Sequence, residues 1–165
     1  VMGLADDTAE GAALLRDAEG VVDQMPQNDD PIQLQQRVDS LISIAEGYYS
    51  LERKENGQAL FTRIEQMIEA MPTPRSRADA LAALGAAQSR LRIPEAEATF
   101  TAAVEAARQI DDLNNRAHAL AEIAMKMPGR DQANALLDEA EKVASQVGDP
   151  GLRNEVQAKI RKARR

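Results

Sequence analysis

Arg77-Ala-Asp-Ala-Leu81-Ala-Ala-Leu84-Gly85 is the stretch that decides the fold, because close copies of it recur along the chain. In each copy an arginine is followed by a large apolar residue, by a second one three positions later, and then by a small residue. This i, i+3, i+4 spacing places the apolar residues on one face of a helix. The copies begin at Arg37, Arg77 and Arg116, and Arg153 opens a fourth, at spacings of 40, 39 and 37 residues. Such self-similarity predicts a repeated unit whose first helix, helix A, starts near each arginine.

A second apolar pattern follows each copy and predicts a second helix, helix B. Residues at the same position of helix B in the three units form a column. The first column holds Phe61, Phe100 and Leu137, and the second holds Ile64, Ala103 and Ala140. Three further columns begin at Met67, Ile68 and Met71. The residues Leu15, Ala18, Val21, Val22 and Met25 fit the same five columns without a gap. We therefore expect the chain to open on a helix B whose own helix A is missing from the sequence.

The predicted helix boundaries rest on capping chemistry. Asp30-Pro31, Thr73-Pro74 and Asp149-Pro150 each place a capping side chain before a proline suited to the first turn of a helix. Gly129 and Gly148 are expected in the left-handed conformation that ends helices. The expected helices span residues 6–25, 31–52, 55–71, 74–91, 95–111, 113–127, 130–147 and 150–163.

Because one helix pair cannot bury both of its apolar stripes, the pairs are expected to stack. The sequence thus predicts an all-α fold, a right-handed α-solenoid of about eight helices in one domain over residues 1–165. Its expected parts are 5–36 (a helix B and a loop), the full repeats 37–76, 77–115 and 116–152, and a polar capping helix at 153–165. In that last helix Gln157 and Arg161 replace apolar or small residues of the repeat pattern.

Composition narrows the function classes. The chain has no cysteine, which excludes disulfides, thiolate metal sites and cysteine nucleophiles. The net charge of −7 disfavours nucleic acid as a partner. Five cations near the C-terminus are expected to complement the negative end of the last helix. They are Lys159, Arg161, Lys162, Arg164 and Arg165. No stretch is long and apolar enough to predict a membrane span. The compartment stays open: cytoplasmic, or exported with a signal that this sequence lacks.

The repeat resembles the tetratricopeptide-like α-solenoids. In the middle unit Leu81, Leu84 and Gly85 fall where that family has its large residue, its leucine and its small residue of helix A. Tyr48 stands at the position of the family's helix A tyrosine. The period of 37–40 residues also fits HEAT-like repeats, which are the second choice. Both families consist of stacked antiparallel helix pairs.

This resemblance implies a protein–protein interaction module without catalytic residues, metal or cofactor. In the tetratricopeptide-like family, ligands usually lie along the concave surface lined by helix A. The residues expected there are Asp39, Glu46, Tyr49, Asp79, Arg90, His118 and Glu122. Because this set holds more acid than base, the expected ligand is a peptide or protein segment with Lys or Arg, anchored by an apolar side chain beside Tyr49. Tyr48 is expected to pack between helices.

A second hypothesis is that the chain has an architectural or oligomerisation role. The first helix carries Leu14, Leu15, Val21 and Val22 without the polar replacements seen at the other end of the chain. An exposed apolar side there would suit a missing helix, a second copy in a homodimer, or another domain of a larger protein.

Interpretations that assign specific chemistry to single residues have less support. His118 and Glu122 share a helix face, but a closed metal site needs about four ligands and this is the only histidine. An ordinary surface pair is the expectation. The recurring arginines are expected to bond the carbonyl end of the preceding helix B or a carboxylate such as Asp112 or Asp149.

Overall fold

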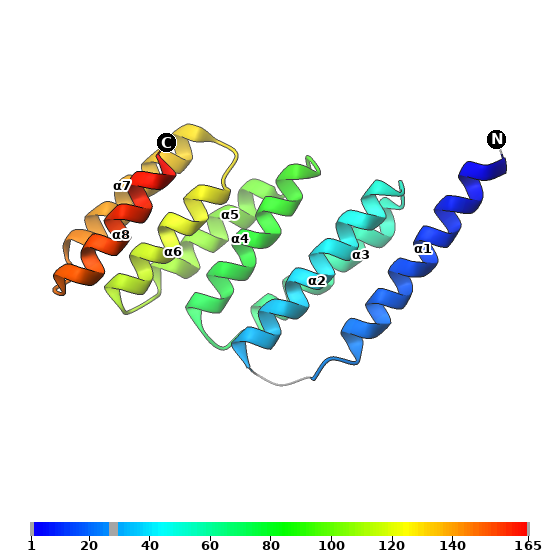
Figure 1. Cartoon of the computed structure of the whole chain (residues 1–165), viewed down its shortest axis with the longest axis horizontal. Helices are drawn as coiled ribbons and strands as arrows, with labels where there is room; N and C mark the ends of the chain where they lie inside the picture. The colour runs from blue at the N-terminus through cyan, green and yellow to red at the C-terminus, as the bar shows by residue number, and fades with distance from the viewer. Residues whose placement is uncertain (1, 27–29, 165) are drawn as a thin grey trace. The chain divides into compact units, whose positions relative to one another are not determined.

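The computed structural model describes residues 2–26 and 30–164, with side chains from residue 8 onward. These residues form eight α-helices and no strand, so the predicted all-α class is confirmed for the part described (Figure 1). The helices are α1 (Met2–Asp23), α2 (Pro31–Ser50), α3 (Lys54–Glu69), α4 (Pro74–Arg90), α5 (Ala96–Arg108), α6 (Leu113–Lys126), α7 (Arg130–Ser145) and α8 (Pro150–Ala163). The largest difference from the predicted bounds is at α1, which begins at Met2 instead of residue 6. Over the same described residues, no helix is long and apolar enough to cross a membrane.

The predicted N-terminal caps are confirmed. The Asp30 carboxylate accepts a hydrogen bond from the backbone N–H of Ile32 at 3.0 Å, and the Asp149 carboxylate accepts one from Leu152 at 2.9 Å. The Thr73 hydroxyl accepts from the N–H of Ser76 at 3.1 Å. In all three helices a proline follows the cap, where its missing N–H costs no hydrogen bond. These contacts fix the starts of α2, α4 and α8.

The prediction of left-handed glycines at helix ends was wrong. No glycine in the described ranges has a positive φ, and Gly129 has φ −84° at the N-cap of α7. The left-handed residues are Glu52 (φ 58°) after α2 and Arg92 (φ 57°) after α4. Each reverses the chain between a helix A and its helix B. The next N–H then returns to the last helical turn, as between Ile93 and the Gln88 carbonyl at 2.8 Å.

Backbone contacts divide the chain into two compact units, Val1–Met71 (unit 1) and Pro72–Arg165 (unit 2). Each unit is described by itself, and the single stack over residues 1–165 stays a prediction.

Unit 1 is centred on α2, which packs against both α1 and α3. Its core contains Leu41 and Tyr48 from α2 and Phe61 and Ile64 from α3, all buried. The hydroxyl of Tyr48 donates to a Glu19 carboxylate oxygen of α1 at 2.6 Å. The expectation that Tyr48 packs between helices is therefore confirmed, and burial with the bond to Glu19 raises the pKa of Tyr48 to about 12.

Unit 2 contains two helix pairs, α4 with α5 and α6 with α7, followed by α8. The three helices A touch in succession, α4 with α6 and α6 with α8. In contrast, no Cα of α5 lies within 8 Å of one of α7 in this part of the chain. The core is rich in alanine, including Ala78, Ala103 and Ala117, and such small side chains let the helix axes come close.

The first two helix B columns predicted from the sequence are buried in unit 2, where they hold Phe100, Leu137, Ala103 and Ala140. Gly85 of α4 explains one close approach: a Cβ at this position would lie 3.3 Å from the Phe100 ring.

Candidate functional site

Four charged side chains from α4, α6 and α8 form a continuous network on the helix A side of unit 2, which we call the charge ladder: Arg75, Asp79, Glu122 and Lys159. Nε of Arg75 donates to Oδ2 of Asp79 at 2.7 Å, and its Nη2 donates to Oε2 of Glu122 at 2.6 Å. Lys159 bonds the other oxygen of Glu122. Arg75 also donates to the backbone carbonyl of Asn115 at 3.1 Å. The ladder therefore ties three successive helices A together.

Helix geometry and the repeat period assemble this ladder. Arg75 and Asp79 are four residues apart on α4, so they lie one above the other on the same helix face. Glu122 and Lys159 are 37 residues apart, the same spacing as Arg116 and Arg153. They therefore occupy equivalent positions on α6 and α8, which contact each other.

The ladder side chains are each about one third exposed, between 27% and 34%. Burial raises the pKa of Asp79, although Arg75 works against this shift. Burial also acts to raise the pKa of Glu122, but the bond from Lys159 and the charge of Arg75 outweigh it and hold that pKa below its usual value. Glu122 is therefore ionised at neutral pH.

His118 lies next to the ladder on α6, one turn before Glu122. Burial lowers its pKa, and the positive charge of Lys159 lowers it further. The imidazole is therefore neutral at pH 7, where it can donate one hydrogen bond and accept another.

Of the predicted groove residues, the structure brings Asp79, His118 and Glu122 together. Arg90 lies at the other end of α4 from Asp79, eleven residues or about 16 Å along the helix. It is exposed and is not part of the ladder.

The groove residues predicted in unit 1 all lie on α2. Asp39 is exposed and accepts a hydrogen bond from the Gln35 amide at 2.9 Å, and Glu46, two turns further on, is half-buried. Tyr49 packs against α3: its ring centroid is 5.8 Å from that of Phe61, and its hydroxyl donates to Gln58 at 3.1 Å. The Tyr49 ring is therefore already engaged inside the hairpin of α2 and α3.

Arg75 and Lys159 were not predicted as site residues. Lys159 was interpreted only as one of several C-terminal cations, although its equivalence to Glu122 was readable from the repeat spacing. Arg164 is also engaged, since it bonds Asp138 at 2.6 Å and Glu141 at 2.8 Å, both on α7. These cations thus pair with carboxylates of neighbouring helices, an interaction that the helix-dipole interpretation did not include.

The structural use of the repeated arginines is confirmed at Arg116. Its Nε donates to the carbonyl of Ile110, just beyond the end of α5, at 2.6 Å. Arg37 is also buried, but its Nε has no hydrogen-bond partner within residues 2–26 and 30–164.

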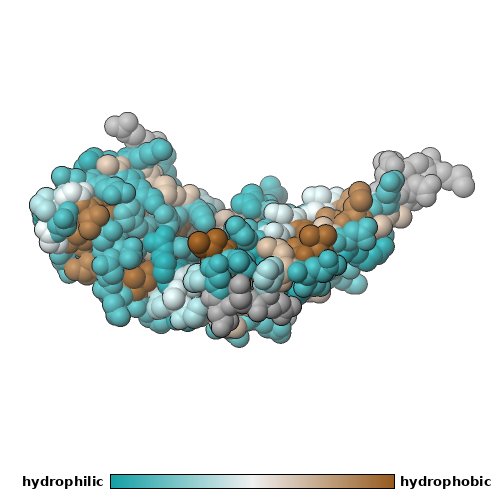
Figure 2. Space-filling view, turned by 60° about the horizontal axis from the view of Figure 1, so that its bottom comes forward, coloured by the Kyte–Doolittle hydropathy of each residue, from teal (hydrophilic) through white to brown (hydrophobic). Residues whose placement is uncertain are grey.

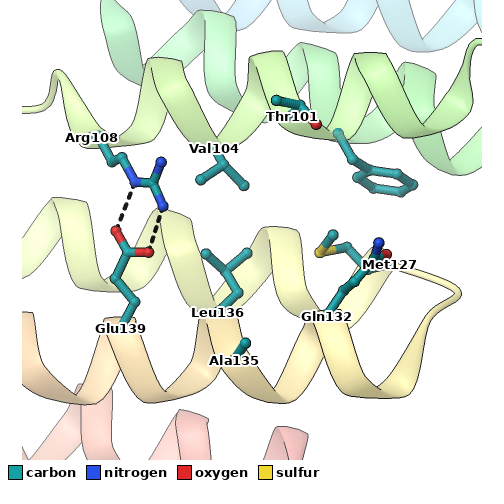
Figure 3. A pocket seen from close by; sticks show the side chains of 9 residues that line it. Thr101, Val104, Arg108, Met127, Gln132, Ala135, Leu136 and Glu139 are labelled. Atoms are coloured by element: carbon teal, nitrogen blue, oxygen red, sulfur yellow. Dashed lines mark hydrogen bonds and ion pairs between the residues drawn. The ribbon is translucent and has the colours of Figure 1, made fainter.

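A hollow of about 340 Å³ lies between α5 and α7 of unit 2 (Figure 3). Val104 and Leu136 form its apolar floor, and at one end Arg108 donates two hydrogen bonds of 2.8 Å to the carboxylate of Glu139. That paired bond lowers the pKa of Glu139. The hollow follows from the separation of the two helices B and is bridged by the ion pair.

The predicted N-terminal interface divides into two faces of α1. Leu14 and Val21 are exposed, whereas Val22 is buried and Leu15 packs on Gly47 of α2. A Cβ at Gly47 would lie only 2.8 Å from a Leu15 methyl group. Val22 therefore belongs to the core of unit 1, Leu15 is half-buried against α2, and of these four residues only Leu14 and Val21 are exposed.

No group of three or more His, Asp or Glu side chains in the described part of the chain is arranged to hold a metal ion. Arg75 and Lys159 both form ion pairs with Glu122, so the surroundings of this carboxylate are those of an ion-pair partner. In comparisons with known proteins, the chain matches no protein family, no curated protein and no solved structure.

Proposed function

We propose that the chain is a tetratricopeptide-like right-handed α-solenoid that binds a segment of another protein along its helix A surface. The repeat of 37–40 residues supports this architecture, as do the contacts of unit 2. There the helices A touch in succession while the helices B α5 and α7 stand apart. Spacing of this kind curves a stack so that its helix A side is the concave one.

The observation that carries the binding proposal is the charge ladder. Its side chains are held by ion pairs between helices yet stay about one third exposed, so a ligand can still reach them. Charges that are fixed before binding lose little conformational entropy when a ligand arrives. They also favour a ligand whose own polar groups match them in position.

The ladder changes where a basic ligand residue would bind. Asp79 and Glu122 already have cationic partners, so they contribute to specificity more than to net attraction. Asp39 is exposed on α2, with a neutral amide as its hydrogen-bond partner. A Lys or Arg of the ligand would therefore bind at Asp39.

Selection from a library of random peptides displayed on phage tests this proposal. The full chain is the bait, and the selected peptides are then measured against the variant Asp39→Lys/Glu46→Lys. We expect peptides enriched in Lys or Arg that bind the variant at least tenfold more weakly. The matched control is Glu69→Lys/Glu105→Lys, which reverses two exposed charges on the helices B α3 and α5.

Enriched peptides that bind the wild type and both variants equally would place the binding surface elsewhere. Failure to enrich any peptide sequence over an unrelated bait would count against a peptide-binding function itself.

A further inference from the structure

The helix α1 carries an apolar stripe that faces away from α2. Its members are Leu14, Ala18, Val21 and Met25, spaced as i, i+4, i+7 and i+11 so that they share one side of the helix. Leu14 and Val21 are each 64% exposed. In Figure 2, brown apolar residues lie at the surface among hydrophilic ones in the right half of the view, the half that contains α1.

Most equivalent positions elsewhere in the described chain are buried, and Met67 and Val143, which match Val21, are half-buried. The repeat columns match Leu14 with Leu60 of α3 and Leu136 of α7, which are 4% and 5% exposed. They match Met25 with Met71 and Ile110, which are also buried. The α1 stripe is therefore more exposed than the equivalent residues of the other repeats.

Unit 2 indicates which element covers these positions. Thr99 is the α5 residue that corresponds to Leu14, and its hydroxyl bonds Gln88 of α4 at 2.7 Å. The column therefore faces the helix A that precedes its helix B. Moreover, α5 contacts both α4 and α6, and α7 contacts both α6 and α8, whereas among the described helices α1 contacts only α2. The contact that α1 lacks is the one with a preceding helix A.

We propose that the α1 stripe binds one amphipathic helix of another protein, which lies antiparallel to α1 in the place of that helix A. The partner helix needs two large apolar residues three positions apart followed by a small one, as in Leu41, Ile44 and Ala45 of α2. The small residue allows close approach of the two helix axes.

Charge at the edge of the stripe specifies the partner further. Glu10 and Asp17 are exposed and seven residues apart, so they run beside Leu14 and Val21 along one edge. If two copies of α1 paired antiparallel about a twofold axis, this acidic edge would face itself, and like charges would repel. The stripe therefore favours a helix that carries Lys or Arg at this edge over a second copy of the chain.

A synthetic peptide with the sequence of residues 74–90 is a suitable probe, because it has the helix A pattern and three arginines. A side-chain cross-link on its polar face keeps it helical, since so short a helix is marginal alone in water. Fluorescence anisotropy with the full chain measures its binding. We expect Leu14→Asp and Val21→Asp each to weaken binding at least tenfold.

Matched controls separate the stripe from general hydrophobicity and from loss of folding. Met125→Asp and Leu152→Asp alter exposed apolar residues of unit 2 and should leave binding unchanged. Circular dichroism should show wild-type helix content for all four variants, since each site is exposed. A peptide with glutamate in place of its arginines should bind at least tenfold more weakly.

Three results would overturn the proposal. The first is the absence of peptide binding. The second is binding that Leu14→Asp and Val21→Asp leave unaltered, as expected if the peptide displaces α4 from its own pair. The third is a dimer in sedimentation equilibrium that Leu14→Asp converts to a monomer, which would make a second copy the occupant. None of these results depends on Asp39 or Glu46, so the peptide-binding surface of the helices A is tested separately.

Discussion

The buried hydrogen bond between Thr99 and Gln88 should contribute measurably to the stability of unit 2. The Thr99 hydroxyl donates to the Gln88 side-chain oxygen at 2.7 Å, and Gln88 is almost completely buried between α4 and α5. Thr99→Val keeps the side-chain volume but leaves the Gln88 oxygen without this donor. A buried acceptor without a partner costs about 1–3 kcal/mol.

The other two corners of the double-mutant cycle should cost less. Gln88→Leu leaves the Thr99 hydroxyl close to the Glu95 carbonyl, 3.1 Å away, so we expect a loss of about 1 kcal/mol. Replacing both partners by apolar groups of similar shape removes the unpaired acceptor, so the double variant should lose no more than about 1 kcal/mol. The predicted coupling energy is thus about 1–3 kcal/mol.

Urea unfolding of the full chain, followed by far-ultraviolet circular dichroism, measures all four corners of the cycle. With a slope of about 1–3 kcal/mol per molar urea, a change of 1 kcal/mol moves the midpoint by about 0.3–1 M. Losses that simply add in the double variant would refute the reasoning, because the two side chains would then not depend on each other.

Three further predictions concern titration and the chain reversals. The single histidine gives one NMR titration curve, and we expect the pKa of His118 below its ordinary value, with Lys159→Met moving it upward. Because the folded-state pKa is lowered, the stability linked to His118 is lost as pH falls through it. Absorbance at 295 nm should show Tyr48 ionising at a pKa of about 12. The free energy of unfolding linked to Tyr48 should decline between pH 10 and 12, because the unfolded chain loses this proton first. Complete tyrosine ionisation in the folded chain by pH 11 would contradict this. Glycine at Glu52 or Arg92 should raise the free energy of unfolding by about 0.5–1 kcal/mol, since glycine adopts positive φ without strain, and an unchanged or lower urea midpoint would count against it.

The helices were predictable because local chemistry marks their ends. A capping side chain before a proline specifies a helix start almost by itself, which is why the predicted starts at Pro31, Pro74 and Pro150 agree with the structure. The apolar columns were predictable for a related reason, since each helix must bury one side.

The left-handed turns at Glu52 and Arg92 were not predictable in the same way. A non-glycine residue in this conformation costs only about 1–2 kcal/mol, which the packing of a helix pair can outweigh, so the sequence carries no glycine to mark the turn. The glycines that are present serve other purposes. At Gly57, for example, a Cβ would lie 2.5 Å from the Tyr49 ring.

The charge ladder was half predictable. Asp79 and Glu122 were predicted from their place on helix A, whereas Arg75 precedes the aligned arginine of its unit and was not predicted as a site residue. Which of several nearby cations reaches a given carboxylate depends on side-chain length and on the distance between helices. The number of residues between two positions in the sequence gives neither of these quantities.

The succession of contacts in unit 2 also has a consequence for how the chain acquires its structure. Every helix there touches only helices one or two places away in sequence, so no long loop must close before favourable contacts form. Proteins with such local contacts fold within microseconds to milliseconds. During synthesis, α4 can pair with α5 before α6 has been made, and each later helix then adds to a surface that already exists. Assembly can thus keep pace with the ribosome from one helix to the next.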